Sequence, residues 1–88
     1  MDLFDMAGQS GRHEVLRKLL TDLRKKQSVT QSELASRLKK QQSFVSKYEI
    51  GERNIDVIEF IEILVALNLD PVETLKLVQE KAFSTRSF

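Results

Sequence analysis

Residues 30–49, TQSELASRLKKQQSFVSKYE, predict two short helices joined by a tight turn. Thr30 can accept a hydrogen bond from the free amides at the start of the first helix, and Glu33 can accept one from the N–H of Thr30. The apolar residues of this first segment fall on one helical face: Leu34, Ala35 and Leu38. The segment therefore predicts an amphipathic helix that starts after Thr30 and packs on a core.

The second half of the stretch predicts a helix with one buried and one exposed face. Val45 and part of Tyr48 are expected to face the core. The remaining side chains lie near the N-terminal half or on the exposed face: Gln42, Ser43, Phe44, Ser46 and Lys47. Gln binds adenine through two hydrogen bonds, Lys prefers the acceptors of guanine, and an exposed apolar group can contact a thymine methyl. This chemistry favours a helix-turn-helix whose second helix contacts base edges in the major groove.

The wider pattern resembles a known family. Residues 16–69 are similar to the phage repressor and Cro-like helix-turn-helix family, often called XRE-type, and the matching segments are TQSELASRL, QSFVSKYEIGERN and IDVIEFIEILVALNLD. The similarity covers roughly two thirds of the chain and involves many positions at fixed spacing. It implies an all-α, five-helix, lambda-repressor-like domain that binds double-stranded DNA.

The resemblance implies roles for the residues that match the family pattern. DNA bases are expected to be contacted by Gln42, Ser43, Phe44 and Lys47. Backbone phosphates are expected to be contacted by Gln31, Lys40, Arg53 and Asn54. Gln31 is also expected to support Gln42. Phe44 has a second interpretation, in which its ring packs partly under the helix.

The same resemblance implies that Arg24 and Glu49 form a partly buried ion pair between the first helix and the end of the third. Three positions depart from the family pattern: Lys39 stands where the turn usually has Gly, Gln41 where a stronger cap is common, and Ile55 where Pro is frequent. Because a non-glycine residue is strained in a left-handed turn, the sequence leaves two geometries open for the turn around Lys39, the left-handed one and a reshaped one.

Periodicity and capping signals predict the other helices. Four leucines on one face indicate a helix over residues 12–26: Leu16, Leu19, Leu20 and Leu23. Asp56 with Glu59 starts a helix that runs to about residue 67, and Asp70 followed by Pro71 starts another that runs to about residue 81. Gly51 is the expected left-handed C-cap of the recognition helix.

We therefore expect a single domain over residues 1–88, with a mobile leader at 1–10, a helical core at 12–81 and a frayed tail at 82–88. No cysteine is present, and His13 alone cannot form a metal site, so neither a metal nor a cofactor is expected. The longest apolar run, residues 63–67, is far shorter than the roughly 20 residues that span a bilayer. The acidic N-terminus does not resemble a signal peptide, so we expect a cytoplasmic protein without a membrane partner.

Charge is unevenly distributed along the chain. The net charge is only +1, but residues 11–53 carry eleven Lys/Arg against five Asp/Glu, whereas residues 54–88 carry three against six. Basic charge is thus concentrated around the predicted recognition helix, as a surface that faces DNA phosphates requires.

The helix predicted over residues 56–67 has more apolar residues than one core-facing stripe needs. That stripe is expected to comprise Val57, Phe60, Ile61, Leu64 and Leu67. Ile58, Ile63 and Val65 are apolar as well. We expect Ile58 and Val65 to form a two-fold dimer interface. The alternative is that the last helix and tail cover them within the monomer, through Leu77 and Phe83.

These observations predict a sequence-specific, double-stranded DNA-binding transcriptional regulator, a repressor-type homodimer on a pseudo-palindromic operator. A restriction–modification controller and an antitoxin that represses its own operon are both compatible subtypes. A protein-interaction adaptor of the same fold is the alternative class. An enzyme is not expected, because the chain lacks cysteine, its one histidine has no matching motif, and no glycine-rich phosphate loop is present.

Overall fold

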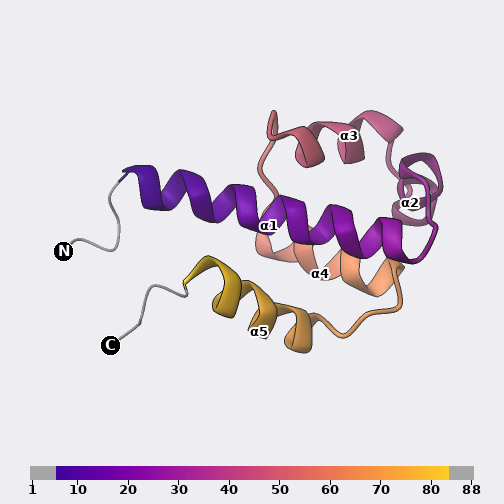
Figure 1. The fold of residues 1–88 in the computed structure, drawn as a ribbon. Helices are drawn as coiled ribbons and strands as arrows, with labels where there is room; N and C mark the ends of the chain where they lie inside the picture. The colour runs from indigo at the N-terminus through magenta and orange to yellow at the C-terminus, as the bar shows by residue number, and fades with distance from the viewer. Residues whose placement is uncertain (1–5, 84–88) are drawn as a thin grey trace.

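The computed structural model describes the backbone of residues 6–83 and the side chains of residues 11–83. Within this part of the chain there are five helices and no strands. Their bounds are α1 Met6–Lys26, α2 Gln31–Leu38, α3 Gln42–Ile50, α4 Val57–Ala66 and α5 Pro71–Ala82 (Figure 1). The all-α fold expected from the sequence is confirmed.

The first helix is longer than predicted. It begins at Met6 rather than near Arg12, so the expected leader over residues 1–10 is wrong for residues 6–10. Once the leucine-rich part of α1 has formed, each further residue adds a backbone hydrogen bond without a new nucleation cost. Gly8 and Gly11 weaken this extension by about 1 kcal/mol each but do not block it. Residues 1–5 of the leader and 84–88 of the tail lie outside the described residues.

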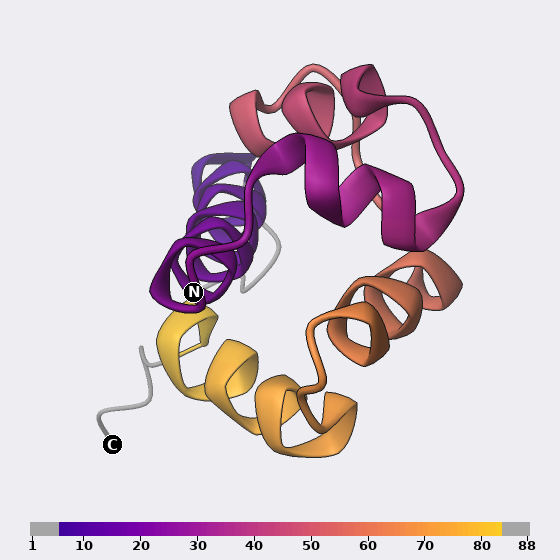
Figure 2. The same ribbon diagram turned by 90° about the vertical axis from the view of Figure 1, so that its right-hand side faces the viewer.

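The five helices enclose one core. The turned view in Figure 2 shows them arranged around a common centre, with α1 opposite α4 and the α2–α3 pair opposite α5. In the described chain α1 packs on α3 and α5, and α4 packs on α2 and α5. The buried cluster at the centre comprises Leu20, Val29, Leu34, Ala35, Val45, Tyr48, Phe60, Ile63, Leu64 and Leu67.

Helix starts follow the capping residues identified in the sequence. The Thr30 hydroxyl accepts the N–H of Glu33 at 3.0 Å, but the Glu33 carboxylate bonds Arg37 instead of returning to the cap. At α4 the two capping hydrogen bonds form a complete capping box: the Asp56 side chain accepts the N–H of Glu59 at 2.8 Å, and the Glu59 side chain accepts the N–H of Asp56 at 2.9 Å. Asp70 caps α5, whose first residue is Pro71. The Gln41 side chain makes no capping hydrogen bond.

The turn between α2 and α3 keeps a left-handed conformation without glycine. Lys39 has φ 58° and ψ 42°, and the N–H of Lys40 donates to the carbonyl of Ala35 at 2.9 Å. Of the two geometries that the sequence left open for this turn, the structure has the left-handed one. The hydrogen bonds that close α2 hold the turn, and Lys39 bears the strain of its Cβ. Gly51, with φ 89°, ends α3 as predicted.

The inward face of α4 is rotated from the expected one. Phe60, Ile63, Leu64 and Leu67 are buried at helical spacing, whereas Val57 and Ile61 are exposed. Ile63 lies in the core because its position, three residues after Phe60, is on the same face as Leu64 and Leu67. The outward face then carries Ile58, Ile61 and Val65, at i, i+3 and i+7, which we call the α4 outer stripe.

The last helix does not cover this outer stripe within the described chain. Ile58 and Val65 remain 60% and 59% exposed. Thr74 and Val78 are the inward residues of α5, while Val72 and Leu75 face solvent. The Phe83 ring lies under the guanidinium of Arg12, with 4.2 Å between the ring centroid and Cζ, so it packs on α1 rather than on α4.

The strained turn leads to a stability prediction. Lys39→Gly should raise the free energy of unfolding by about 1 kcal/mol, because glycine adopts this left-handed conformation without a Cβ penalty. Urea unfolding monitored by circular dichroism measures the change. Lys39→Ala is the control, since it removes the charge but keeps the Cβ; an equal gain from both variants would show that backbone strain is not the cause.

Candidate nucleic-acid interface

A buried ion pair joins α1 to the end of α3. Arg24 Nε donates to Glu49 Oε2 at 2.8 Å and Arg24 Nη2 donates to Oε1 at 3.0 Å, so one edge of the guanidinium binds both carboxylate oxygens. The two side chains are only 8% and 5% exposed. Nη1 donates to the carbonyl of Val29 at 2.8 Å, which also ties the loop before α2 to the pair. The hydrogen bonds that Arg24 donates to Glu49 raise the pKa of Arg24.

Gln31 connects this ion pair to the start of the recognition helix. Its Nε2 donates to Glu49 Oε1 at 2.8 Å, and its Oε1 accepts a long hydrogen bond of 3.5 Å from Gln42 Nε2. An ionised carboxylate can only accept, so Glu49 fixes which end of the Gln31 amide faces Gln42. The structure thus brings together the two glutamines that the sequence placed in adjacent roles.

The outward side of α3 carries three of the predicted base-contacting residues. Gln42, Ser43 and Lys47 are exposed, while Val45 and Tyr48 are buried on the opposite side. Ser46, which the sequence placed among the exposed residues, is partly buried, and its hydroxyl donates to the carbonyl of Ser43 at 3.3 Å.

Phe44 packs within the protein and also touches two cations. Its ring meets Tyr48 edge to face, with 5.5 Å between centroids, and it is partly buried. The charged ends of Lys40 and Arg53 lie 4.9 and 4.7 Å from the ring centroid. Lys40 precedes α3 and Arg53 follows it, and both were predicted to contact phosphates. The Phe44 ring therefore makes cation–π contacts with two of the predicted phosphate-binding residues.

The connection from α3 to α4 carries the other predicted phosphate contacts. Asn54 is exposed, and Arg53 forms a bidentate ion pair with Glu59, with Nη2 to Oε2 at 2.8 Å and Nη1 to Oε1 at 3.0 Å. Hydrogen bonds from Arg53 lower the pKa of Glu59, and those with Glu59 raise the pKa of Arg53. This pairing was not predicted from the sequence, although the Asp56–Glu59 capping box places a carboxylate close to the loop.

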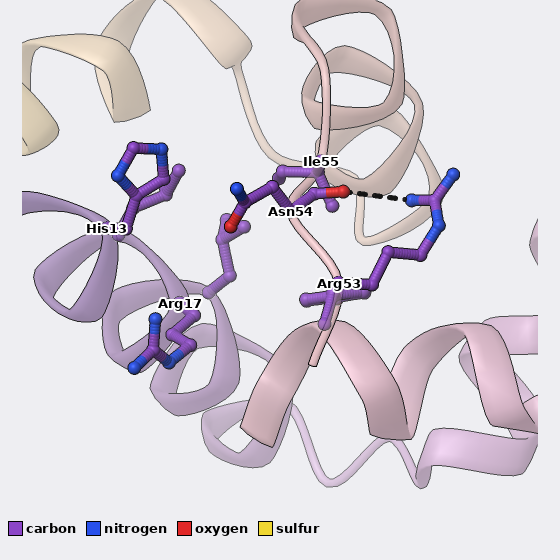
Figure 3. A pocket seen from close by; sticks show the side chains of 8 residues that line it. His13, Arg17, Arg53, Asn54 and Ile55 are labelled. Atoms are coloured by element: carbon purple, nitrogen blue, oxygen red, sulfur yellow. Dashed lines mark hydrogen bonds between the residues drawn. The ribbon is translucent and has the colours of Figure 1, made fainter. Parts of the chain in front are cut away.

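A small pocket separates this connection from α1. Figure 3 shows His13 and Arg17 reaching it from α1, with Asn54 and Ile55 on the other side, while the Arg53 guanidinium points away from Arg17. Arg17, for which the sequence predicted no role, lies over Gly51: a Cβ at Gly51 would come 2.9 Å from Arg17 Cζ. A cation at this place suits the C-terminal end of α3.

Tyr48 is a residue of α3 that is buried in the core. Its ring is 2% exposed, and burial raises the pKa of its hydroxyl. The hydroxyl has no hydrogen-bond partner in the described part of the chain. Tyr48 therefore acts through packing, since it supports both Phe44 and the helix that carries Glu49.

Comparison with known proteins identifies the fold family. A helix-turn-helix family model matches residues 20–73. Among solved structures, the chain is similar to an XRE-family like protein from Pseudomonas syringae pv. tomato str. DC3000, with 40% sequence identity, coverage of 83% of this chain and 89% of that one, and a TM-score of 0.79. The chain belongs to the XRE-type helix-turn-helix family. No curated protein matches it in sequence.

Family membership confirms the resemblance stated from the sequence. This XRE-type protein is a DNA-binding transcription regulator, and regulators of this family are typically not enzymes. No described helix has the length and apolar character needed to cross a membrane. The family match begins inside α1 and ends in the first turn of α5. The parts of α1 and α5 beyond it meet each other, and Arg12 Nε donates to the carbonyl of Ala82 at 3.3 Å.

The buried ion pair leads to a stability prediction. Arg24→Ala or Glu49→Ala should each lower the free energy of unfolding by roughly 3–5 kcal/mol, because each leaves an uncompensated buried charge. The double variant should lose less than the sum of the two single losses. Thermal melts of all four proteins measure the coupling. Lys18→Ala, which removes an exposed ion pair with Asp22, is the control and should cost at most about 1 kcal/mol. Strict additivity at Arg24 and Glu49 would contradict the coupling.

Proposed function

We propose that this XRE-type protein is a sequence-specific regulator of the repressor type, which binds a pseudo-palindromic DNA operator in the cytoplasm as a homodimer. The observation that best supports sequence specificity is the arrangement of α3. It exposes Gln42, Ser43 and Lys47 while the Glu49–Gln31 hydrogen bond holds the support for Gln42 in place.

In this proposal α3 enters the major groove and its exposed side chains contact base edges. Gln42 uses one N–H on Gln31, which leaves one N–H and its carbonyl oxygen for the DNA. That pair complements N7 and the N6 amino group of adenine. Ser43 and Lys47, with Phe44 between them, are assigned to neighbouring bases, and Phe44 contributes an apolar edge.

The phosphate contacts flank the recognition helix in the same proposal. The N-terminus of α2, with Gln31, faces one DNA backbone, where the helix dipole favours an anion. Lys40, Arg53 and Asn54 lie on the two sides of α3 and contact phosphates there. The net charge of +6 over residues 11–53 supports this orientation.

The homodimer is proposed to form through the α4 outer stripe. Ile58, Ile61 and Val65 share one face and are 60%, 41% and 59% exposed, and burying such side chains is worth about 1.5–3 kcal/mol each. Val72 and Leu75 on the neighbouring α5 are also exposed and add apolar area. A two-fold axis at this face would present two recognition helices to half-sites about one helical turn apart.

The same outer stripe supports a second candidate function, in which the protein acts as an adaptor that binds another protein. Salt dependence distinguishes the two. DNA binding through phosphates weakens steeply as salt is raised, with a log–log slope of about −0.9 per phosphate neutralised. Binding of a mixed-sequence duplex, followed by selection from a random duplex library, tests the regulator. Absent or salt-insensitive binding would favour the adaptor.

Gln42→Ala should relax base preference at one operator position. The loss of a bidentate base contact should cost roughly 1–3 kcal/mol on the selected site, with little change on mixed-sequence DNA. Gln41→Ala is a matched control, because Gln41 is the adjacent exposed glutamine and makes no capping bond. Equal losses on selected and mixed DNA would show that Gln42 does not contact a base.

The double variant Ile58→Glu/Val65→Glu should be a folded monomer that binds its operator weakly, because two charges then stand in the apolar interface. Sedimentation at tens of micromolar measures the association state. Lys81→Glu changes the net charge by the same amount at an exposed position of α5 and should stay dimeric. A monomeric wild type, or a dimeric double variant, would place the interface elsewhere.

A further inference from the structure

The contacts of Arg53 leave one particular edge of its guanidinium available. The group has five N–H donors in one plane. Nη1 donates to Glu59 Oε1 at 3.0 Å and to the carbonyl of Asn54 at 3.1 Å, and Nη2 donates to Glu59 Oε2 at 2.8 Å. Within the described residues nothing accepts from Nε–H or from the second N–H of Nη2, and these two donors lie side by side on one edge.

The buried arginine of the fold, Arg24, pairs through a different edge of its guanidinium. Arg24 donates from its Nε/Nη2 edge to Glu49 and is buried. Arg53 donates from its Nη1/Nη2 edge to Glu59 and is 43% exposed. Arg24 therefore has a purely internal role, whereas Arg53 keeps a complete two-donor edge for a ligand outside the domain.

We propose that Glu59 is a positioning residue, which holds Arg53 so that its Nε/Nη2 edge binds the two non-bridging oxygens of one DNA phosphate. Two parallel N–H···O bonds match this acceptor geometry. Glu59 is itself fixed, since Oε1 also accepts the N–H of Asp56 in the α4 capping box. The Phe44 ring supports the guanidinium from one side, at 4.7 Å. This inference rests on the proposed function and adds a residue that does not touch DNA.

The ion pair also changes what Arg53 contributes electrostatically. A cation already paired with a carboxylate adds little net charge to the surface, so Arg53 acts through the geometry of its edge. Two quantities separate these effects: the salt slope reports net charge at the phosphates, and the affinity extrapolated to about 1 M salt, where the Debye length is about 3 Å, reports short-range contacts.

The experiment measures binding of the full chain to a mixed-sequence duplex over a range of salt concentrations. Glu59→Gln keeps an acceptor for the capping box but removes the charge and the second strong acceptor for Arg53. Its salt slope should steepen by about 0.9, because Arg53 is no longer neutralised. Its affinity extrapolated to about 1 M salt should nevertheless fall, so the two binding lines cross.

Arg53→Lys is the matched variant, because it keeps the charge and its pairing with Glu59 but has no two-donor edge. Its salt slope should equal that of the wild type, with affinity about tenfold lower at every salt concentration, because one hydrogen bond to the charged phosphate is lost. Thermal melts verify that both variants are folded.

The outcomes separate this inference from the proposed function. A wild type that fails to bind the duplex overturns both. The second outcome is that the wild type binds and the Glu59→Gln variant has a steeper salt slope, but its affinity never falls below that of the wild type. In that case Glu59 only neutralises charge and the positioning role is wrong. Variant lines that coincide with the wild type would show that Arg53 does not face the DNA.

Discussion

The buried pair of Arg24 and Glu49 is the interaction on which the rest of the structure depends. It joins the end of α1 to the end of α3, and the third donor of Arg24 holds the loop that leads into α2. Its desolvation is offset only because both carboxylate oxygens and the guanidinium donors are hydrogen-bonded. The orientation of α3 relative to α1 and α2 is therefore set by directional contacts as well as by core packing. That orientation decides which side of α3 is exposed.

Polar contacts extend from this pair to the surface in order of increasing exposure. Glu49 orients Gln31, and Gln31 meets Gln42 at the start of the recognition helix. On the other side of α3, Glu59 orients Arg53 as Glu49 orients Gln31. In both cases the carboxylate can only accept hydrogen bonds, so it determines which polar atoms of its partner remain unbonded. The proposed DNA interface is thus preorganised by groups that lie behind it. Preorganisation lowers the ordering cost of binding.

Helix α4 serves two surfaces at once. Its buried residues close the core beneath α2, while its outer stripe of Ile58, Ile61 and Val65 remains exposed in the described chain. A single core needs only one stripe of an amphipathic helix. The second stripe is unnecessary for folding the monomer, and this excess is why the proposed assembly is placed there rather than on the charged side of the domain.

The sequence by itself determined the helix-turn-helix, its capping residues and the candidate contacts on α3, because these depend on local spacing and on residue chemistry. It also indicated the Arg24–Glu49 partnership, through resemblance to a family. Only the tertiary structure decided which side of α4 is buried, since nearly every position there is apolar and periodicity cannot choose between overlapping stripes. Likewise only the fold showed that Glu59 holds Arg53 and that α1 continues to Met6. Pairings between elements depend on how helices cross, and the conformation at Lys39 depends on hydrogen bonds that close α2; neither is encoded in the period of a single segment.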